Sequence, residues 1–95
     1  MSQVVVVATI TARAGAEAAL AELLSAQVGP TRLEAGCLRY DLHRDPTQLA
    51  TLVFLENWES KEALKAHMST PRFLAARDRQ GDLVAARDIK VLEQI

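Results

Sequence analysis

The chain has 95 residues, a hydrophobic fraction of 49% and a formal net charge of −1, which together predict one small domain spanning residues 1–95. Its 11 Lys and Arg residues are scattered, which argues against nucleic acid as a partner, and its one cysteine, Cys37, excludes an internal disulfide and a cysteine-based zinc site. A single unpaired thiol, together with the lack of a signal-peptide pattern and of an apolar run long enough to span a bilayer, predicts a cytoplasmic protein without a membrane partner.

The first 36 residues predict a strand followed by an interrupted helix. Residues 4–13 are rich in β-branched side chains, and their even-numbered positions are uniformly apolar, so this face should meet the helices. From Ala16 the apolar residues recur at helical spacing. Gly29 and Pro30 should break or kink this helix, and a last turn over 31–35 should end at Gly36 as a C-terminal cap.

The middle of the chain predicts two more strands. Residues 37–44 alternate, with Leu38, Tyr40 and Leu42 on one side, which indicates a half-buried strand. Residues 50–58 are apolar on both faces at first, so both sides of this strand should be covered.

Two helices and a strand are expected in the last third. Ser60 should cap a helix over 61–69 whose apolar stripe turns His67 inward. Thr70 and Pro71 should then start a short helix to about residue 78 that buries Phe73 and Leu74, followed by a strand over 85–95.

The order of these elements, β-α-β-β-α-β, predicts an α+β fold of the ferredoxin-like βαββαβ type, with a four-stranded antiparallel sheet and its helices on one face. The other face would carry Val5, Val7, Val53 and Leu55. Because such a face is unfavourable in water, a second copy of the chain is its natural cover, and we expect a homodimer.

A candidate site follows from this fold. Residues 36–73 place Tyr40, Glu56, Trp58 and His67 in an otherwise apolar region. His67 lies about seven residues beyond Ser60, a rise of ~10 Å along a helix, which equals about three positions on the preceding strand. His67 should therefore lie over Glu56, in a slot between sheet and helices floored by Phe54 and Trp58, with Phe73 and Met68 near its lid.

The same residues carry a family resemblance. Residues 13–15 (RAG), 34–40 (EAGCLRY), 54–60 (FLENWES), Ala63-Leu64 and His67 resemble the antibiotic biosynthesis monooxygenase family in order and approximate spacing. The family consists of homodimeric α+β barrels. It includes cofactor-independent quinol and anthrone oxygenases, heme-degrading enzymes and members without an assigned activity.

The resemblance implies a cofactor-independent monooxygenase that oxidises a small phenolic, quinol or anthrone-type aromatic with O₂ and uses no metal. In this reading His67 is the catalytic base, Tyr40 hydrogen-bonds the substrate, and Glu56 orients His67 or accepts a second proton. Trp58 would stack on the substrate ring. The remaining expected substrate contacts are Phe54, Phe73 and Met68.

Other interpretations remain open at this point. Trp58, Tyr40 and His67 also suit an ordinary core, and Glu56 could pair with Arg39 or Arg87. Heme-degrading relatives use a histidine and a tryptophan at the positions of His67 and Trp58, but Ala8 stands where they have an asparagine. A non-catalytic dimeric binding module is the third alternative, and an enclosed pocket of several hundred cubic ångströms would favour the enzyme over a filled core.

Overall fold

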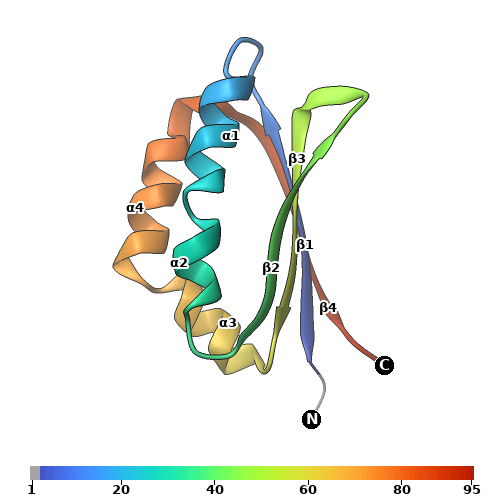
Figure 1. Ribbon diagram of the computed structural model, residues 1–95, viewed down its shortest axis with the longest axis vertical. Helices are drawn as coiled ribbons and strands as arrows, with labels where there is room; N and C mark the ends of the chain where they lie inside the picture. Colours follow the sequence, from blue (N-terminus) through green and yellow to red (C-terminus); the bar gives the residue numbers. More distant parts are fainter. Residues whose placement is uncertain (1–2) are drawn as a thin grey trace.

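Residues 3–95, which the computed structural model describes, form a four-stranded antiparallel sheet with helices packed against one face (Figure 1). The strands are β1 (Val4–Ala12), β2 (Cys37–Asp45), β3 (Gln48–Trp58) and β4 (Val84–Glu93), in the order β2-β3-β1-β4. The helices are α1 (Glu17–Ser25), α2 (Val28–Arg32), α3 (Lys61–Met68) and α4 (Pro71–Gln80), followed by the 3₁₀ turn η1 (Gly81–Leu83). The predicted ferredoxin-like fold is confirmed, with each helical segment divided in two.

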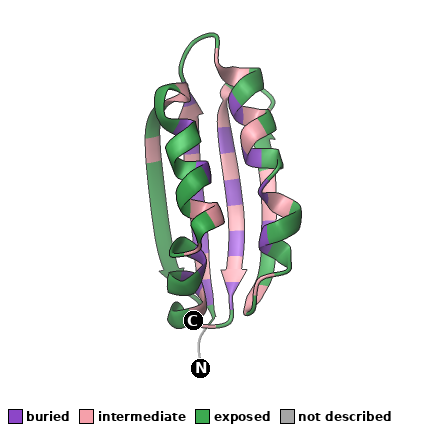
Figure 2. Ribbon diagram, turned by 90° about the vertical axis from the view of Figure 1, so that its left-hand side faces the viewer, coloured by how far each residue is buried: buried purple, intermediate pink, exposed green. Residues whose placement is uncertain are grey.

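β1 is the central strand that orients the core. It pairs with β3 on one side and β4 on the other. Its even-numbered residues face the helices and are at most 5% exposed, whereas its odd-numbered residues from Val5 to Thr11 are half-buried. The neighbouring strand β3 shows the same alternation, which is visible in Figure 2 as purple and pink bands. The predicted assignment of the two faces is confirmed.

The break in the first helical segment lies earlier than predicted. α1 ends at Ser25, and both Gly29 and Pro30 lie inside α2, which begins at Val28. A continuous helix would need an amide proton on Pro30 to bond the Ala26 carbonyl. The chain interrupts the helix at residues 26–27 instead, so that Pro30 lies in the first turn of α2, where no amide has a helical partner.

A β-bulge corrects the predicted pattern of β2. Cys37 pairs with Trp58 and Arg39 pairs with Asn57, which leaves Leu38 as an extra residue. Leu38 is therefore 54% exposed instead of sharing the buried face of Tyr40. The bulge turns both Cys37 and Tyr40 toward the helices, which the strict alternation of a regular strand does not allow.

Both predicted helix starts in the last third are confirmed. The Ser60 hydroxyl accepts a hydrogen bond from the Ala63 amide, and the Thr70 hydroxyl accepts one from the Phe73 amide. The predicted burial of Leu74 is wrong, since it is 56% exposed. The buried face of α4 follows the i, i+3, i+7 positions from Phe73 to Ala76 and Gln80, which turns Leu74 outward.

β3 begins two residues before its predicted start, and α4 runs two residues beyond its predicted end. No helix within residues 3–95 is long and apolar enough to cross a membrane.

Gly36 is the glycine with the strictest steric requirement. Its φ is +83°, and a Cβ built there would lie 2.5 Å from the Cβ of Ala63. We expect Gly36→Ala to lower the free energy of unfolding by about 2–4 kcal/mol, because a left-handed backbone and an overpacked contact add. Gly15 has a φ of +87°, but a Cβ built there would meet no atom within 4 Å, so Gly15→Ala should lower the free energy of unfolding by only about 1 kcal/mol. Urea denaturation of the two variants measures the difference, and equal losses would contradict the steric account.

Candidate functional site

The aromatic side chains of the predicted site form one cluster between the sheet and the helices. Tyr40 stacks on Phe54 at a centroid distance of 4.7 Å and lies edge-on to His67 at 5.6 Å. The His67 ring also packs against Trp58 and Phe73, at centroid distances of 4.7 Å and 5.0 Å. The fold thus brings together side chains from β2, β3, α3 and α4 around a single imidazole.

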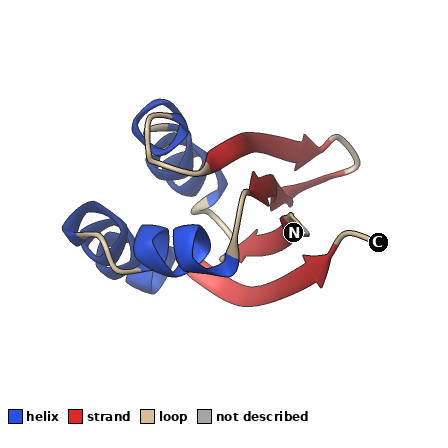
Figure 3. Ribbon diagram, turned by 90° about the horizontal axis from the view of Figure 1, so that it is seen from below, coloured by secondary structure: helices blue, strands red, loops and turns tan. Residues whose placement is uncertain are grey.

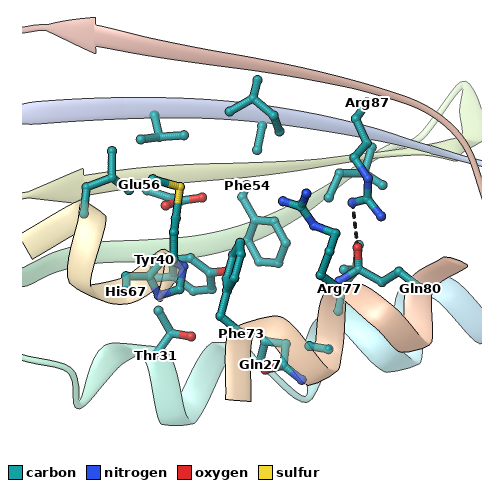
Figure 4. Close-up of a pocket in the computed structure, with 18 of the residues that line it drawn as sticks. Gln27, Thr31, Tyr40, Phe54, Glu56, His67, Phe73, Arg77, Gln80 and Arg87 are labelled. Atoms are coloured by element: carbon teal, nitrogen blue, oxygen red, sulfur yellow. Dashed lines mark hydrogen bonds between the residues drawn. The ribbon is translucent and has the colours of Figure 1, made fainter. Parts of the chain in front are cut away.

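A cavity of about 80 Å³ opens beside this cluster (Figure 4). Six of the seven predicted site residues line it: Tyr40, Phe54, Glu56, His67, Met68 and Phe73. Its volume is below the several hundred cubic ångströms of most ligand sites. Four of its lining residues, Met68, Arg77, Ile89 and Val91, are exposed, so the cavity is open between the helices and β4.

Trp58 is the predicted site residue that does not line the cavity. It is fully buried behind His67, and its indole Nε1–H donates a hydrogen bond of 2.9 Å to Oε1 of Glu56. Glu56 does not pair with either arginine considered above, since Arg39 bonds Asp41 and Arg87 bonds Gln80. Trp58 therefore lies where it can position His67 and Glu56, but not stack directly on a molecule in the cavity.

A hydrogen-bond network that the sequence analysis missed holds His67 in place. Its Nδ1 lies 2.8 Å from Oε1 of Glu34, and the other oxygen of Glu34 accepts a hydrogen bond from Arg72. The Arg72 guanidinium also donates to Gln27 at 2.7 Å and to Thr31 at 3.1 Å. In the sequence, the only indication that Glu34 belongs to the site is its place in the 34–40 motif, because no local spacing links Glu34 to His67.

This network determines which nitrogen of His67 is free. Glu34 forms an ion pair with Arg72, and a carboxylate can only accept hydrogen bonds. The proton of a neutral imidazole must therefore reside on Nδ1. The lone pair is then on Nε2, which is available to take a proton from a ligand.

Comparisons with known proteins agree with the family resemblance seen in the sequence. Residues 3–79 match the family described as antibiotic biosynthesis monooxygenase. The chain belongs to this family. Its relative from Mycobacterium tuberculosis, named "Putative monooxygenase Rv0793", is 39% identical over 83 residues, which cover 87% of this chain and 81% of the relative.

Two solved structures superpose closely on this chain. PA3566 from Pseudomonas aeruginosa gives a TM-score of 0.95 at 36% identity and covers 100% of this chain and 96% of its own. Rv0793 gives a TM-score of 0.92 at 36% identity, with 99% and 96% covered. These comparisons support a monooxygenase at the level of the family and do not specify a substrate.

The residues present do not fit heme, the cofactor of the heme-degrading relatives. His67 is 4% exposed and enclosed by aromatic rings, and the cavity of about 80 Å³ is far smaller than a porphyrin requires. Ala8 lines the cavity at the position where those relatives carry an asparagine. Within residues 3–95 no three His, Cys, Asp or Glu side chains are grouped so that they could hold a metal ion.

Burial shifts the titration of the site residues in opposite directions. It lowers the pKa of His67, although the hydrogen bond to Glu34 opposes the shift, and it raises the pKa of Glu56 to about 7 despite the Trp58 hydrogen bond. Burial and then the charge of Glu56 raise the pKa of Tyr40. Near neutral pH the site therefore holds a neutral imidazole, a carboxyl group close to half-protonation and a protonated phenol.

Glu56 should make stability depend on pH. Its pKa rises from 4.5 in the unfolded chain to about 7 in the folded protein, so stability falls as pH rises through this interval. Glu56→Gln keeps an oxygen for the Trp58 hydrogen bond but cannot ionise. Between pH 5 and 8 we expect the unfolding free energy of the wild type to fall by roughly 2–3 kcal/mol more than that of the variant.

Chemical denaturation across this pH range measures the effect. Glu62→Gln, which removes an exposed carboxylate on α3, is the control and should follow the wild type. Identical pH profiles for the wild type and Glu56→Gln would contradict the raised pKa.

Proposed function

We propose that this protein is a cofactor-independent monooxygenase that oxidises a small phenol, quinol or anthrone with O₂. One observation carries the proposal: a buried imidazole, held by Glu34 with its Nε2 free, lies beside a cavity lined by aromatic rings. Such an imidazole can remove a proton from a hydroxyl group, and the rings can hold a planar substrate.

Proton removal is the step that the protein must supply. A phenolate or quinol anion donates electrons to O₂ far more readily than its protonated form does, so no metal or flavin is needed to begin the reaction. The complete reduction of O₂ takes four electrons, and the substrate provides all of them. One oxygen atom enters the organic product, and the other leaves as water with the two hydrogens that the substrate loses. The oxidation of a quinol to a hydroxyquinone balances in this way.

The other polar groups have complementary roles in this proposal. Tyr40, protonated because burial raises its pKa, donates a hydrogen bond to a substrate oxygen. Glu56, with a pKa of about 7, can accept a proton and return it as water leaves. Phe54, Phe73 and Met68 supply the apolar walls.

Removing the imidazole tests the proposal. We expect His67→Ala and His67→Gln to reduce oxygen uptake with quinols or anthrones by at least ~100-fold, as expected for loss of a general base. His43→Ala, at an exposed position on β2 that does not line the cavity, should retain full uptake. An oxygen electrode measures the rates, and circular dichroism verifies that the variants are folded. Unchanged uptake in both His67 variants would remove His67 from the mechanism.

The small cavity favours one alternative, a binding module without turnover. A volume of about 80 Å³ holds only part of a two-ring molecule, as a recognition pocket for one aromatic group would. The panel of quinols and anthrones distinguishes the two functions, because a binding module would bind members of the panel without consuming oxygen above the blank rate.

We further propose that the protein acts as a homodimer through the uncovered face of its sheet. The helices lie on one side only, as Figure 3 shows from below. On the other side Val7 pairs with Leu55, and Val5 pairs with Leu92, which is 46% exposed. Charged residues of β2 and β4 flank this apolar centre. An apolar centre with a polar rim is the arrangement of a protein interface.

A charge in this apolar centre should separate the two copies. We expect the wild type to have the mass of a dimer in light scattering coupled to size exclusion, and Leu55→Lys to have that of a monomer at the same concentration, because a buried lysine without a partner is costly. Leu33→Lys, at a position that is 89% exposed beside α2, should leave the mass unchanged. A monomeric wild type would refute this interface.

A further inference from the structure

Two arginines face each other at the end of the cavity remote from His67. Arg77 from α4 and Arg87 from β4 both line the cavity, and Figure 4 shows their side chains on the opposite side of Phe54 from His67. The Arg87 guanidinium donates a hydrogen bond of 2.6 Å to Gln80, and the Arg77 guanidinium lies 5.1 Å from the centre of the Phe73 ring. Gln80 and Phe73 thus hold the two guanidinium groups near each other.

Neither arginine is neutralised by a carboxylate. The ion pairs found within residues 3–95 involve Arg32, Arg39, His67, Arg72 and Lys90, but not Arg77 or Arg87. Burial and then the positive charge of Arg77 lower the pKa of Arg87, so the two charges are close enough to repel. An anion between them would relieve this repulsion and accept hydrogen bonds from both.

The distance between the two ends of the cavity limits the shape of such a ligand. Glu56 pairs with Val6 of β1, and Arg87 pairs with Ile10, four positions further along the same strand. Four positions correspond to ~13 Å of strand, which sets the scale of the separation between the two ends of the cavity. The walls between the two ends are apolar, with Ile10 and Phe54 among them.

We propose that the substrate is an aromatic carboxylic acid whose carboxylate binds Arg77 and Arg87 while its hydroxyl group, at the far end of the ring system, lies at His67. This inference rests on the proposed function for the role of the His67 end. It also accounts for the small cavity, because the acidic end of the substrate would lie in the open part beside β4, where Arg77 and Ile89 are exposed.

Binding of three probes to the full chain, measured anaerobically by calorimetry, tests the proposal. The first is 6-hydroxy-2-naphthoate, with hydroxyl and carboxylate at opposite ends. The second, 3-hydroxy-2-naphthoate, has the same charge but adjacent groups, and the third, 2-naphthol, has no carboxylate. We expect the first to bind about tenfold more tightly than either of the others, consistent with a charged hydrogen bond at a partly exposed site.

Arginine variants then locate the anion. Arg77→Gln and Arg87→Gln should each weaken binding of 6-hydroxy-2-naphthoate about tenfold and leave the affinity for 2-naphthol unchanged. Arg79→Gln, an exposed arginine of α4 that does not line the cavity, is the matched control and should bind like the wild type. Arg87→Lys keeps the charge and should recover part of the affinity, which distinguishes charge from a packing defect.

The proposal is overturned if 6-hydroxy-2-naphthoate binds the wild type no more tightly than 2-naphthol does, or if the glutamine variants weaken both ligands equally. These outcomes are separate from a failure of the proposed function. Binding is measured without oxygen, so arginine-dependent selectivity can hold even where His67 variants prove to be irrelevant to oxygen uptake.

Discussion

The Glu34 carboxylate is the constraint on which the site depends. It lies between α2 and β2, yet one of its oxygens bonds His67 of α3 and the other bonds Arg72 of α4. Arg72 in turn bonds Gln27 and Thr31, so a single ion pair joins both helical segments above the sheet. Without this carboxylate, the buried His67 and the half-buried Arg72 would each lose a partner, and leaving such groups unpaired is costly.

The same burial that stabilises the fold prepares the chemistry. Moving an imidazole and a carboxyl group out of water disfavours the charged form of each, which lowers the pKa of His67 and raises that of Glu56. Trp58 acts on the two groups in different ways: its ring covers one side of His67, and its hydrogen bond to Glu56 opposes part of the upward shift of the Glu56 pKa. Its role is thus to hold two titratable groups at the edge of a cavity that it does not itself reach.

Local rules predicted what depends on neighbours in the chain. The alternation of β1, the caps at Ser60 and Thr70, and the inward direction of His67 follow from periods and capping preferences. Glu34 could not be found in this way, because 33 residues separate it from His67 and their contact exists only in the folded chain. The exposure of Leu38 was unpredictable for a related reason: the bulge depends on which residues of β3 pair with β2.

The arrangement of the sheet also explains how so small a chain can carry a cavity on one face of the sheet and the proposed dimer interface on the other. Successive side chains of a strand point to opposite faces, so in β1 Val6 and Ala8 line the cavity while Val5 and Val7 face away from the helices. A partner on the second face would leave the mouth of the cavity open. It would also bury Leu92 of the edge strand β4, the strand that carries Arg87 and Ile89 at that mouth. In the proposed dimer, association would therefore cover one face of the strand whose other face forms a wall of the site, without blocking entry to it.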